Sequence, residues 1–374
     1  MQSTLPGGPT MFVALRDLRH ARGRFALMLL VITLITFLVT FLSSLTAGLA
    51  RESTSAITDL PSTYLSFSMP ETDAAPEFTA SSVTRQQWEA WGEAPDVSNA
   101  EPLGVATTRA RSAAQTVAVT AFGVLPSSAL LGDASAPSDG AVVLSSVAAE
   151  ALAADPGDTV AIAGQDLLVT AVLESDASFA HTPAIWVTLT DWQAIGAPGN
   201  TGGDDLTATA IAITSKGLSA AERSTLDADL GTTTLTTAQA RTAISSFSSE
   251  NSSLLTMQAF LIAISALVVG AFFTVWTISR SGDVAVLKAL GASTRYLLRD
   301  AIGQAALVLV LGVGLGVGLA VAAATALASV VPVEVTNATM ALPALALIAL
   351  GLAGAALAIT RIARIDPHAA LAAH

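Results

Sequence analysis

Long uncharged runs and charged, mixed segments alternate along this chain in a pattern that predicts four membrane-spanning helices. No Asp, Glu, Lys or Arg occurs in residues 25–50, 251–279, 301–333 and 335–360. Each run exceeds the roughly 20 apolar residues that cross a bilayer core of about 30 Å, whereas buried helices of soluble proteins are usually shorter. We therefore predict transmembrane helices at 25–50, 251–279, 301–333 and 338–360.

In residues 51–250, short stretches with the hydrophobic pattern of strands alternate with short stretches that have the pattern of helices, which is typical of a folded α+β domain. Residues 141–152 read as a strand that continues into a helix, and a hairpin is expected around Gly164 and Gln165. Ser219 and Glu222 form the pattern of a capping box at the start of a helix. The Thr-rich run 231–237 reads as a loop. The predicted fold class is an α-helical membrane protein with four transmembrane helices and an α+β extracytoplasmic domain between helices 1 and 2.

Charge predicts which side of the membrane each segment occupies. The segments 1–24, 280–300 and 361–374 hold ten basic and four acidic residues, and the rest of the chain holds seven basic and 25 acidic residues. The positive-inside rule therefore places a cytoplasmic N-terminal amphipathic segment at 1–24, a cytoplasmic loop at 280–300 and a cytoplasmic tail at 361–374. It places 51–250 outside, and the acidic charge of that domain argues against a nucleic-acid partner.

Several kinds of chemistry are excluded by the residues themselves. Cysteine is absent, and neither lysine, Lys216 or Lys288, follows a glycine, so a Gly-Lys-Ser/Thr phosphate loop cannot form. The four histidines are scattered, with His181 alone in the outer domain. We therefore expect no enzyme active site, no metal site and no intrinsic cofactor, and any ATP is bound by a separate subunit.

The loop 280–300 reads as a short amphipathic helix. Val284, Leu287 and Leu290 share one face, Lys288 lies on another, and Gly291 ends the helix. Such a helix fits the groove of a cytoplasmic partner, although a plain connector would show a similar pattern.

The run from Asp283 to Ser293, DVAVLKALGAS, resembles the signature of the FtsX/MacB-type permeases of ABC transporters, and the tail 365–371, IDPHAAL, resembles the closing motif of that family. The resemblance implies a homodimeric, multi-pass permease of the bacterial cell membrane that works with a separate dimeric ABC ATPase, and charge places both of its termini in the cytoplasm. It assigns ATPase coupling to Asp283, Leu287, Lys288, Leu290 and Gly291. We expect the helices at 25–50 and 251–279 to line the two-fold axis, with Ser44 and Ser253 accessible there.

Within that family the chain is most similar to the HrtB-type haem-efflux permeases, which implies export of an amphipathic substrate with haem as the leading candidate. Two alternatives stay open. One is an exporter of lipid, peptide or macrolide. The other is a non-transporting mechanotransmission subunit that regulates an extracellular cell-wall hydrolase.

A haem site would need an axial ligand, a cation for the propionates and apolar walls. Glu250 precedes an uncharged run and is the candidate iron ligand, with Glu52 nearby and Arg51 as the counter-charge. The apolar walls are assigned to Phe41, Leu45, Leu254 and Met257. Ionisable residues at a membrane mouth are also common as interface anchors, and His181 is a competing ligand.

Overall fold

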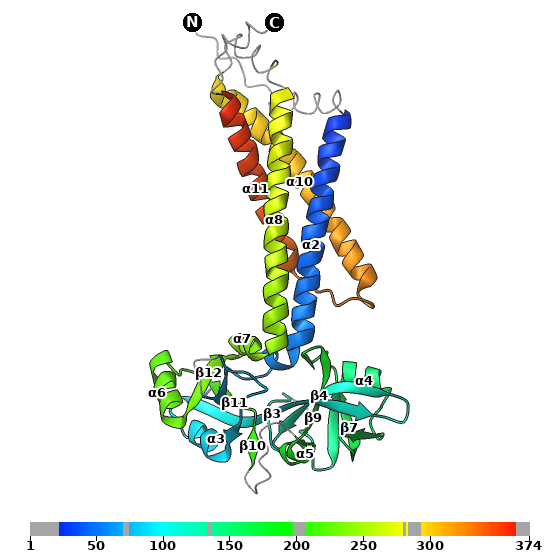
Figure 1. Cartoon of the computed structure of the whole chain (residues 1–374), viewed down its shortest axis with the longest axis vertical. Coiled ribbons are helices and arrows are strands. Elements are labelled where there is room, and N and C mark those ends of the chain that lie inside the picture. Colours follow the sequence, from blue (N-terminus) through cyan, green and yellow to red (C-terminus); the bar gives the residue numbers. More distant parts are fainter. Residues whose placement is uncertain are drawn as a thin grey trace, which may run out of the picture. The chain divides into compact units, whose positions relative to one another are not determined.

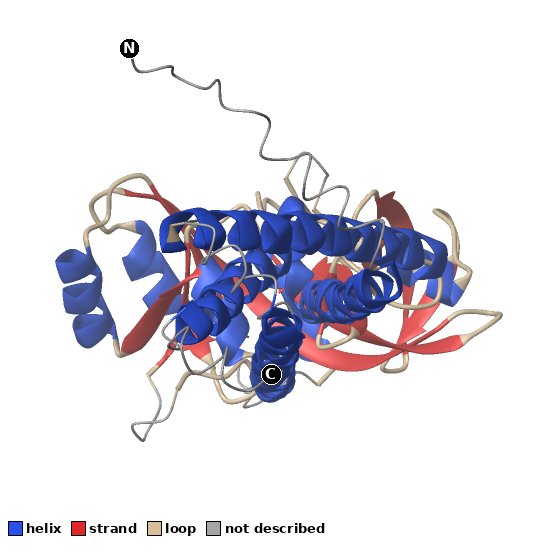
Figure 2. Ribbon diagram, turned by 90° about the horizontal axis from the view of Figure 1, so that it is seen from above, coloured by secondary structure: helices blue, strands red, loops and turns tan. Residues whose placement is uncertain are grey.

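The computed structural model describes residues 22–69, 75–132, 136–196, 206–279, 282 and 293–363. The chain divides into two compact units. We call residues 49–252 the inserted domain, and residues 1–48 with 253–374 the membrane unit. Every described strand belongs to the inserted domain, and the described part of the membrane unit is built from helices (Figures 1 and 2).

Four helices have the length and composition to cross a membrane. They are α2 (Arg22–Thr58), α8 (Ser245–Ser279), α10 (Thr294–Leu327) and α11 (Asn337–Ala363). With the mixed domain inserted between the first two, they confirm the predicted fold class. Helix α10 ends at Leu327 rather than at residue 333. Pro332 disfavours helical backbone in the residue before it, so the apolar run continues beyond the helix as a connection.

Two glycines of α10 bring it close to α2. A Cβ on Gly312 would lie 2.7 Å from Cγ2 of Ile32, and a Cβ on Gly316 would lie 2.5 Å from Cβ of Thr36. The Thr33 hydroxyl donates a hydrogen bond of 3.2 Å to the Gly312 carbonyl oxygen across the same contact. Small residues allow this close approach between membrane helices. The two glycines therefore mark the face of α10 that packs against α2.

The connection between α10 and α11 packs against α2. The Ser44 hydroxyl donates to the Glu334 carbonyl oxygen at 2.8 Å, and the Glu334 backbone N–H donates to the Ser44 carbonyl oxygen at 3.0 Å. The Ser44 side chain is fully buried. Our expectation that Ser44 is accessible at a two-fold axis is therefore wrong, because the chain's own connection covers it.

The inserted domain interleaves strands and short helices. Its strands are β1 (Tyr64–Ser68), β2 (Val83–Thr84), β3 (Val97–Arg111), β4 (Thr116–Val124), β5 (Ala141–Ser145), β6 (Thr159–Ile162), β7 (Gln165–Leu173), β8 (Ser178–Phe179), β9 (Thr182–Thr188), β10 (Thr207–Ala208), β11 (Ala210–Ser215) and β12 (Thr232–Thr236). Its helices are α3 (Arg85–Gly92), α4 (Ser146–Leu152), α5 (Leu189–Ala194), α6 (Ala220–Leu230) and α7 (Thr237–Ala240), with a short 3-10 turn η1 (Arg241–Ala243).

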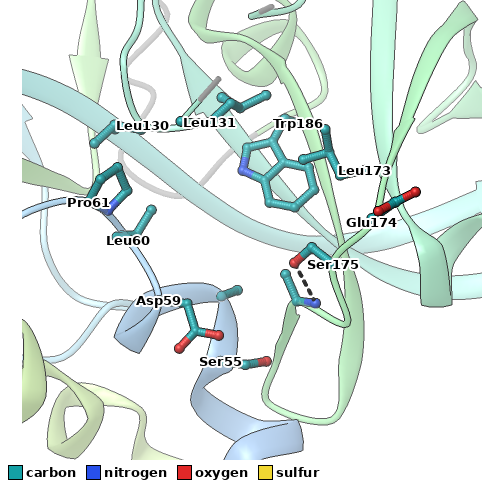
Figure 3. Close-up of a pocket in the computed structure, with 13 residues that line it drawn as sticks. Ser55, Asp59, Leu60, Pro61, Leu130, Leu131, Leu173, Glu174, Ser175 and Trp186 are labelled. Carbon is teal, nitrogen blue, oxygen red and sulfur yellow. Dashed lines mark hydrogen bonds between the residues drawn. The ribbon is translucent and has the colours of Figure 1, made fainter. Parts of the chain in front are cut away.

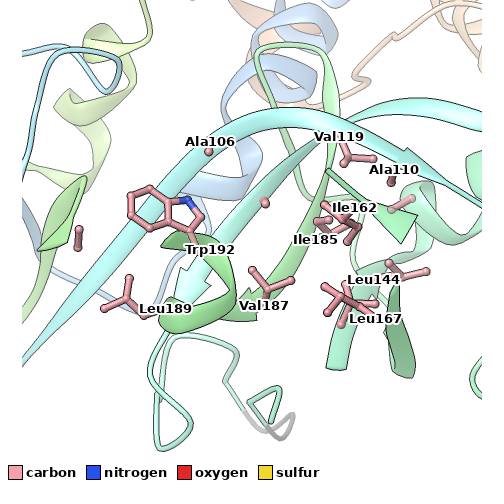
Figure 4. Packing of buried hydrophobic residues seen from close by; sticks show 14 of the residues in the cluster. Ala106, Ala110, Val119, Leu144, Ile162, Leu167, Ile185, Val187, Leu189 and Trp192 are labelled. Atoms are coloured by element: carbon pink, nitrogen blue, oxygen red, sulfur yellow. The ribbon is translucent and has the colours of Figure 1, made fainter. Parts of the chain in front are cut away.

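The long strand β3 belongs to two parts of one sheet. Its second half pairs with β4 and β6, and the order β3-β4-β9-β5-β7-β6 returns to β3, so six strands close on themselves. Closure removes exposed strand edges. The interior is filled by side chains such as Leu144, Ile162, Ile185 and Trp192 (Figure 4).

The first half of β3 continues the sheet through β11, β1 and β12. The predicted loop at 231–237 is wrong, because β12 occupies residues 232–236 and pairs with the whole of β1. Threonine is β-branched and favours strands, and this signal outweighs the polar composition of the run. The capping box of Ser219 and Glu222 is confirmed at the start of α6. The hairpin turn between β6 and β7 is formed by Ala163 and Gly164, one residue earlier than expected.

Candidate functional site

His181 is presented at the tip of a tight hairpin. Strands β8 and β9 pair Phe179 with Thr182, which leaves Ala180 and His181 as the two turn residues. Both have positive φ, 48° and 61°, as a type I′ turn requires. The backbone therefore fixes where the imidazole points.

The imidazole lies between two glutamates. Its Nε2 is 2.8 Å from a carboxylate oxygen of Glu250, and its Nδ1 is 3.4 Å from a carboxylate oxygen of Glu52. We call Glu52, His181 and Glu250 the His–Glu cluster; all three belong to the inserted domain. Partial burial lowers the pKa of His181, but hydrogen bonds to both carboxylates and their charges outweigh burial, so its pKa lies above the ordinary value.

This raised pKa predicts a pH-dependent stability. A group whose pKa is higher in the folded state stabilises the folded protein. Its contribution is fully present at a pH below the pKa of the unfolded state, about 6.5 for histidine, and is lost as the pH rises through the folded-state pKa. The cluster is partly exposed, so we expect a loss of only about 0.5 kcal/mol of unfolding free energy. Chemical unfolding of the full chain, followed by tryptophan fluorescence at about pH 6 and about pH 9, measures it.

The matched variant is His181→Asn. Asparagine tolerates positive φ, so the turn is kept while the titrating group is removed. We expect this variant to lose the pH dependence in that window. An equal dependence in the parent and in His181→Asn would assign it to other groups.

Arg51 directly precedes Glu52 on α2 and is engaged with two aspartates. Its guanidinium donates to Asp176 at 2.9 and 3.1 Å and to Asp59 at 3.1 Å. The hydrogen bond from Arg51 lowers the pKa of Asp176. For Arg51 to act as the counter-charge of haem propionates, these carboxylates would have to release it.

The remaining predicted residues lie on the membrane helices. Phe41 and Leu45 are half-buried on α2, and Phe41 stacks on Phe37 with ring centroids 5.8 Å apart. On α8, Leu254 is half-buried and Met257 is 59% exposed. The proposed coupling residues lie outside the described part of the chain; they are Asp283, Leu287, Lys288, Leu290 and Gly291.

The sequence offers His181 as a competitor of Glu250, whereas in the structure the two side chains are hydrogen-bonded neighbours. Nothing in the sequence singles out Asp176 as the partner of Arg51. The sequence does not predict the hairpin, because neither Ala180 nor His181 is a residue type that is common in type I′ turns. Only the folded domain brings residues 52, 181 and 250 together.

Comparison with known families settles the class of the protein. Residues 25–228 match the MacB-like periplasmic core domain, and residues 255–367 match the FtsX-like permease C-terminal domain. The chain belongs to the FtsX/MacB-type permeases. Members of this family are membrane permease components of ABC transporters. The family thus accounts for both the inserted domain and the helices that follow it.

Individual relatives are more distant. Two proteins of Staphylococcus epidermidis, each described as a putative hemin transport system permease protein HrtB, are 26% identical over 150 residues. The match covers 40% of this chain and 43% of each relative, so the chain spans less than half their length.

Two solved structures are similar to this chain. The extracellular domain of the noncanonic ABC-type transporter YknZ from Gram-positive bacteria is 18% identical with a TM-score of 0.34, covering 46% of this chain and 98% of that one. The periplasmic region of MacB from Actinobacillus actinomycetemcomitans is 11% identical with a TM-score of 0.36, covering 52% and 97%.

Proposed function

We propose that this permease is the membrane subunit of an efflux pump that exports an amphipathic molecule, with haem as the leading substrate. The observation that carries the proposal is the match of both halves of the chain to one permease family. The choice of haem is supported by the similarity to the putative hemin permeases of Staphylococcus epidermidis. A lipid, peptide or macrolide remains the alternative cargo.

The proposed topology follows from charge. The inserted domain carries seven basic and 24 acidic residues, whereas the segments 1–24, 280–300 and 361–374 carry the excess of basic residues. By the positive-inside rule, both termini and the loop 280–300 face the cytoplasm, and the inserted domain faces outward. ATP hydrolysis then takes place on a separate, dimeric ATPase at the cytoplasmic face.

A homodimer is the proposed working unit. Helix α8 exposes a series of large apolar side chains in the single chain, namely Leu255, Met257, Phe260, Ile264, Leu267, Val275 and Ile278. Lipid and a second copy of α8 are both apolar enough to cover this surface. The two-fold axis is assigned to α2 and α8 as before, with Ser253 in place of Ser44 as the accessible test position, because Ser253 is exposed and Ser44 is buried.

The His–Glu cluster is the proposed ligand source for the haem iron. Glu250 lies in the second turn of α8, immediately before the uncharged run 251–279. The imidazole of His181 is the stronger iron ligand by type, and the Glu250 carboxylate is harder and releases its cargo more easily. Because the two groups are hydrogen-bonded, a substitution of one also changes the other.

The test compares Glu250→Gln with His181→Asn in the purified permease–ATPase complex. We expect Glu250→Gln to reduce haem binding, measured by the Soret band, and haem-stimulated ATP hydrolysis about tenfold, a loss of about 1.4 kcal/mol. His181→Asn should have a smaller effect, because in this proposal the Glu250 carboxylate binds the iron and the His181 Nε2 is engaged in its hydrogen bond to Glu250. Glu150→Gln, an exposed glutamate of α4 in the same domain, is the control.

If His181→Asn reduces haem binding more than Glu250→Gln does, the iron ligand is His181, at the tip of the hairpin, rather than Glu250. If the parent complex itself shows no haem binding and no haem-stimulated hydrolysis, the haem assignment is overturned. Lipid, peptide and macrolide are then tested in turn as stimulants, and a complex that responds to none of them favours the mechanotransmission role.

A further inference from the structure

A cavity of about 600 Å³ lies within the inserted domain, and none of its lining residues belongs to the His–Glu cluster (Figure 3). Its lining comes from four segments. These are Ser55, Ala56, Asp59, Leu60 and Pro61 at the end of α2 and in the turn that follows, residues 130–132 after β4, Leu173, Glu174, Ser175 and Ala177 at and after the end of β7, and Trp186 of β9. Its volume is in the range of 300–1,000 Å³ that is usual for small-molecule sites.

One side of the cavity is apolar and fixed by packing. Leu60, Leu130 and Trp186 line it, yet each is less than one-tenth exposed, because the body of each side chain is held in the domain core. The indole of Trp186 stacks on Phe122 with the ring centroids 6.1 Å apart. Figure 3 shows the indole in the wall, with Leu130, Leu131 and Leu60 on the side opposite Leu173. The wall is therefore formed before any ligand binds.

Two of the other lining residues are acidic. Asp59 and Glu174 contribute carboxylates, and none of the described residues that line the cavity is Lys, Arg or His. Arg51 pairs with Asp59 and with Asp176 beside the cavity. One guanidinium thus faces two aspartates, and Glu174 forms no salt bridge within the described part of the chain. Together these four groups keep two negative charges.

An apolar wall with a large aromatic ring and an anionic edge matches one class of ligand. Aromatic faces and carboxylates both attract cations, and the leucines accept an apolar body. A ligand with carboxylates of its own would meet repulsion from Asp59 and Glu174. A bare metal ion is not favoured, because the described residues contain no group of three His, Asp or Glu side chains that could hold one.

We propose that this cavity binds an amphipathic organic cation, with its apolar body against Leu60, Leu130 and Trp186 and its positive charge toward Glu174 and Asp59. The residues that line the cavity do not include Glu52, His181 or Glu250 of the His–Glu cluster. The permease would therefore bind a second class of ligand in this cavity, whichever substrate the His–Glu cluster binds.

The experiment uses two probes of the same shape and opposite charge, tetraphenylphosphonium and tetraphenylborate. Equilibrium dialysis against the full chain in lipid nanodiscs measures the binding of each. Both probes also enter the lipid, but this partition is common to every variant, so differences between variants report on the cavity. The test variant is Glu174→Lys and the matched control is Glu150→Lys, since both glutamates are exposed and only Glu174 lines the cavity.

We expect Glu174→Lys to weaken tetraphenylphosphonium binding about tenfold, a change of about 1.4 kcal/mol, and the Glu150→Lys control to bind like the parent. Tetraphenylborate should bind no better to the parent than to empty nanodiscs. A second readout is tryptophan fluorescence. Tetraphenylphosphonium should quench the tryptophan fluorescence of the parent, and the Trp186→Phe variant should lack the part of the quenching that comes from Trp186. Equal binding in both lysine variants, or equal specific binding of both probes, would overturn the proposal.

Discussion

Replacing Leu287 and Leu290 together by aspartate is expected to separate the permease from its ATPase. Both leucines lie on the apolar face of the predicted amphipathic helix in the loop 280–300. A few apolar anchors carry most of the energy of such an interface, at about 2 kcal/mol or more each. The double variant should therefore bind the ATPase at least about 100-fold more weakly, by the usual relation of about 1.4 kcal/mol per tenfold.

Co-purification of the ATPase with the tagged permease, together with the affinity in nanodiscs, measures this effect. The control is Leu287→Met with Leu290→Met, which keeps the apolar surface and nearly the same volume. The aspartate pair should also abolish substrate-stimulated ATP hydrolysis while the basal rate of the free ATPase is unchanged. An intact complex with normal stimulated hydrolysis would show that the ATPase binds elsewhere.

Substituting Gly312 and Gly316 by alanine is the second large effect that we expect, this time on stability. A Cβ on Gly316 would lie 2.5 Å from Cβ of Thr36 and 2.7 Å from the backbone oxygen of Thr33, and the backbone atom cannot move without shifting α2. Overpacking of this kind costs about 1–3 kcal/mol per site, so the pair should lose about 3 kcal/mol of unfolding free energy.

The same helix provides the matched control. Gly314 and Gly318 have the same spacing, but a Cβ on either meets no atom within 4 Å. Alanine there should be neutral or stabilising, since glycine disfavours helix by up to about 1 kcal/mol relative to alanine. Thermal unfolding in detergent measures both double variants. The unfolding temperature should fall when Gly312 and Gly316 are replaced, and should stay the same or rise when Gly314 and Gly318 are replaced. Equal destabilisation of both would show that the helices do not pack as described.

The four spans were predictable because uncharged length is a strong signal that needs no tertiary information. The capping box at Ser219 was also predictable, since its contacts lie within one turn of helix. The two glycine pairs of α10 could not be told apart from sequence. Both have the spacing of a packing motif, and only the position of α2 decides which pair is used.

The candidate site was predictable only in part. Glu250 and Glu52 are predicted from their places beside apolar runs, which the sequence shows directly. Their link through His181 depends on a hairpin turn that the sequence does not mark and on a long-range fold. The cavity beside Trp186 combines four separate segments, and periodicity carries no information on which segments meet.

The place of β1 in the sheet sets the order in which the inserted domain is completed during synthesis. Tyr64 pairs with Ile213 on one side and with Thr236 on the other, so both neighbours of β1 are made long after it. The closed ring of six strands needs only residues up to β9 and is complete much earlier. At about 5–20 residues per second, β1 waits roughly 10–30 s for its second neighbour. During that time a newly made chain lacks the partners of β1, and an unpaired strand edge is a template on which another chain can pair.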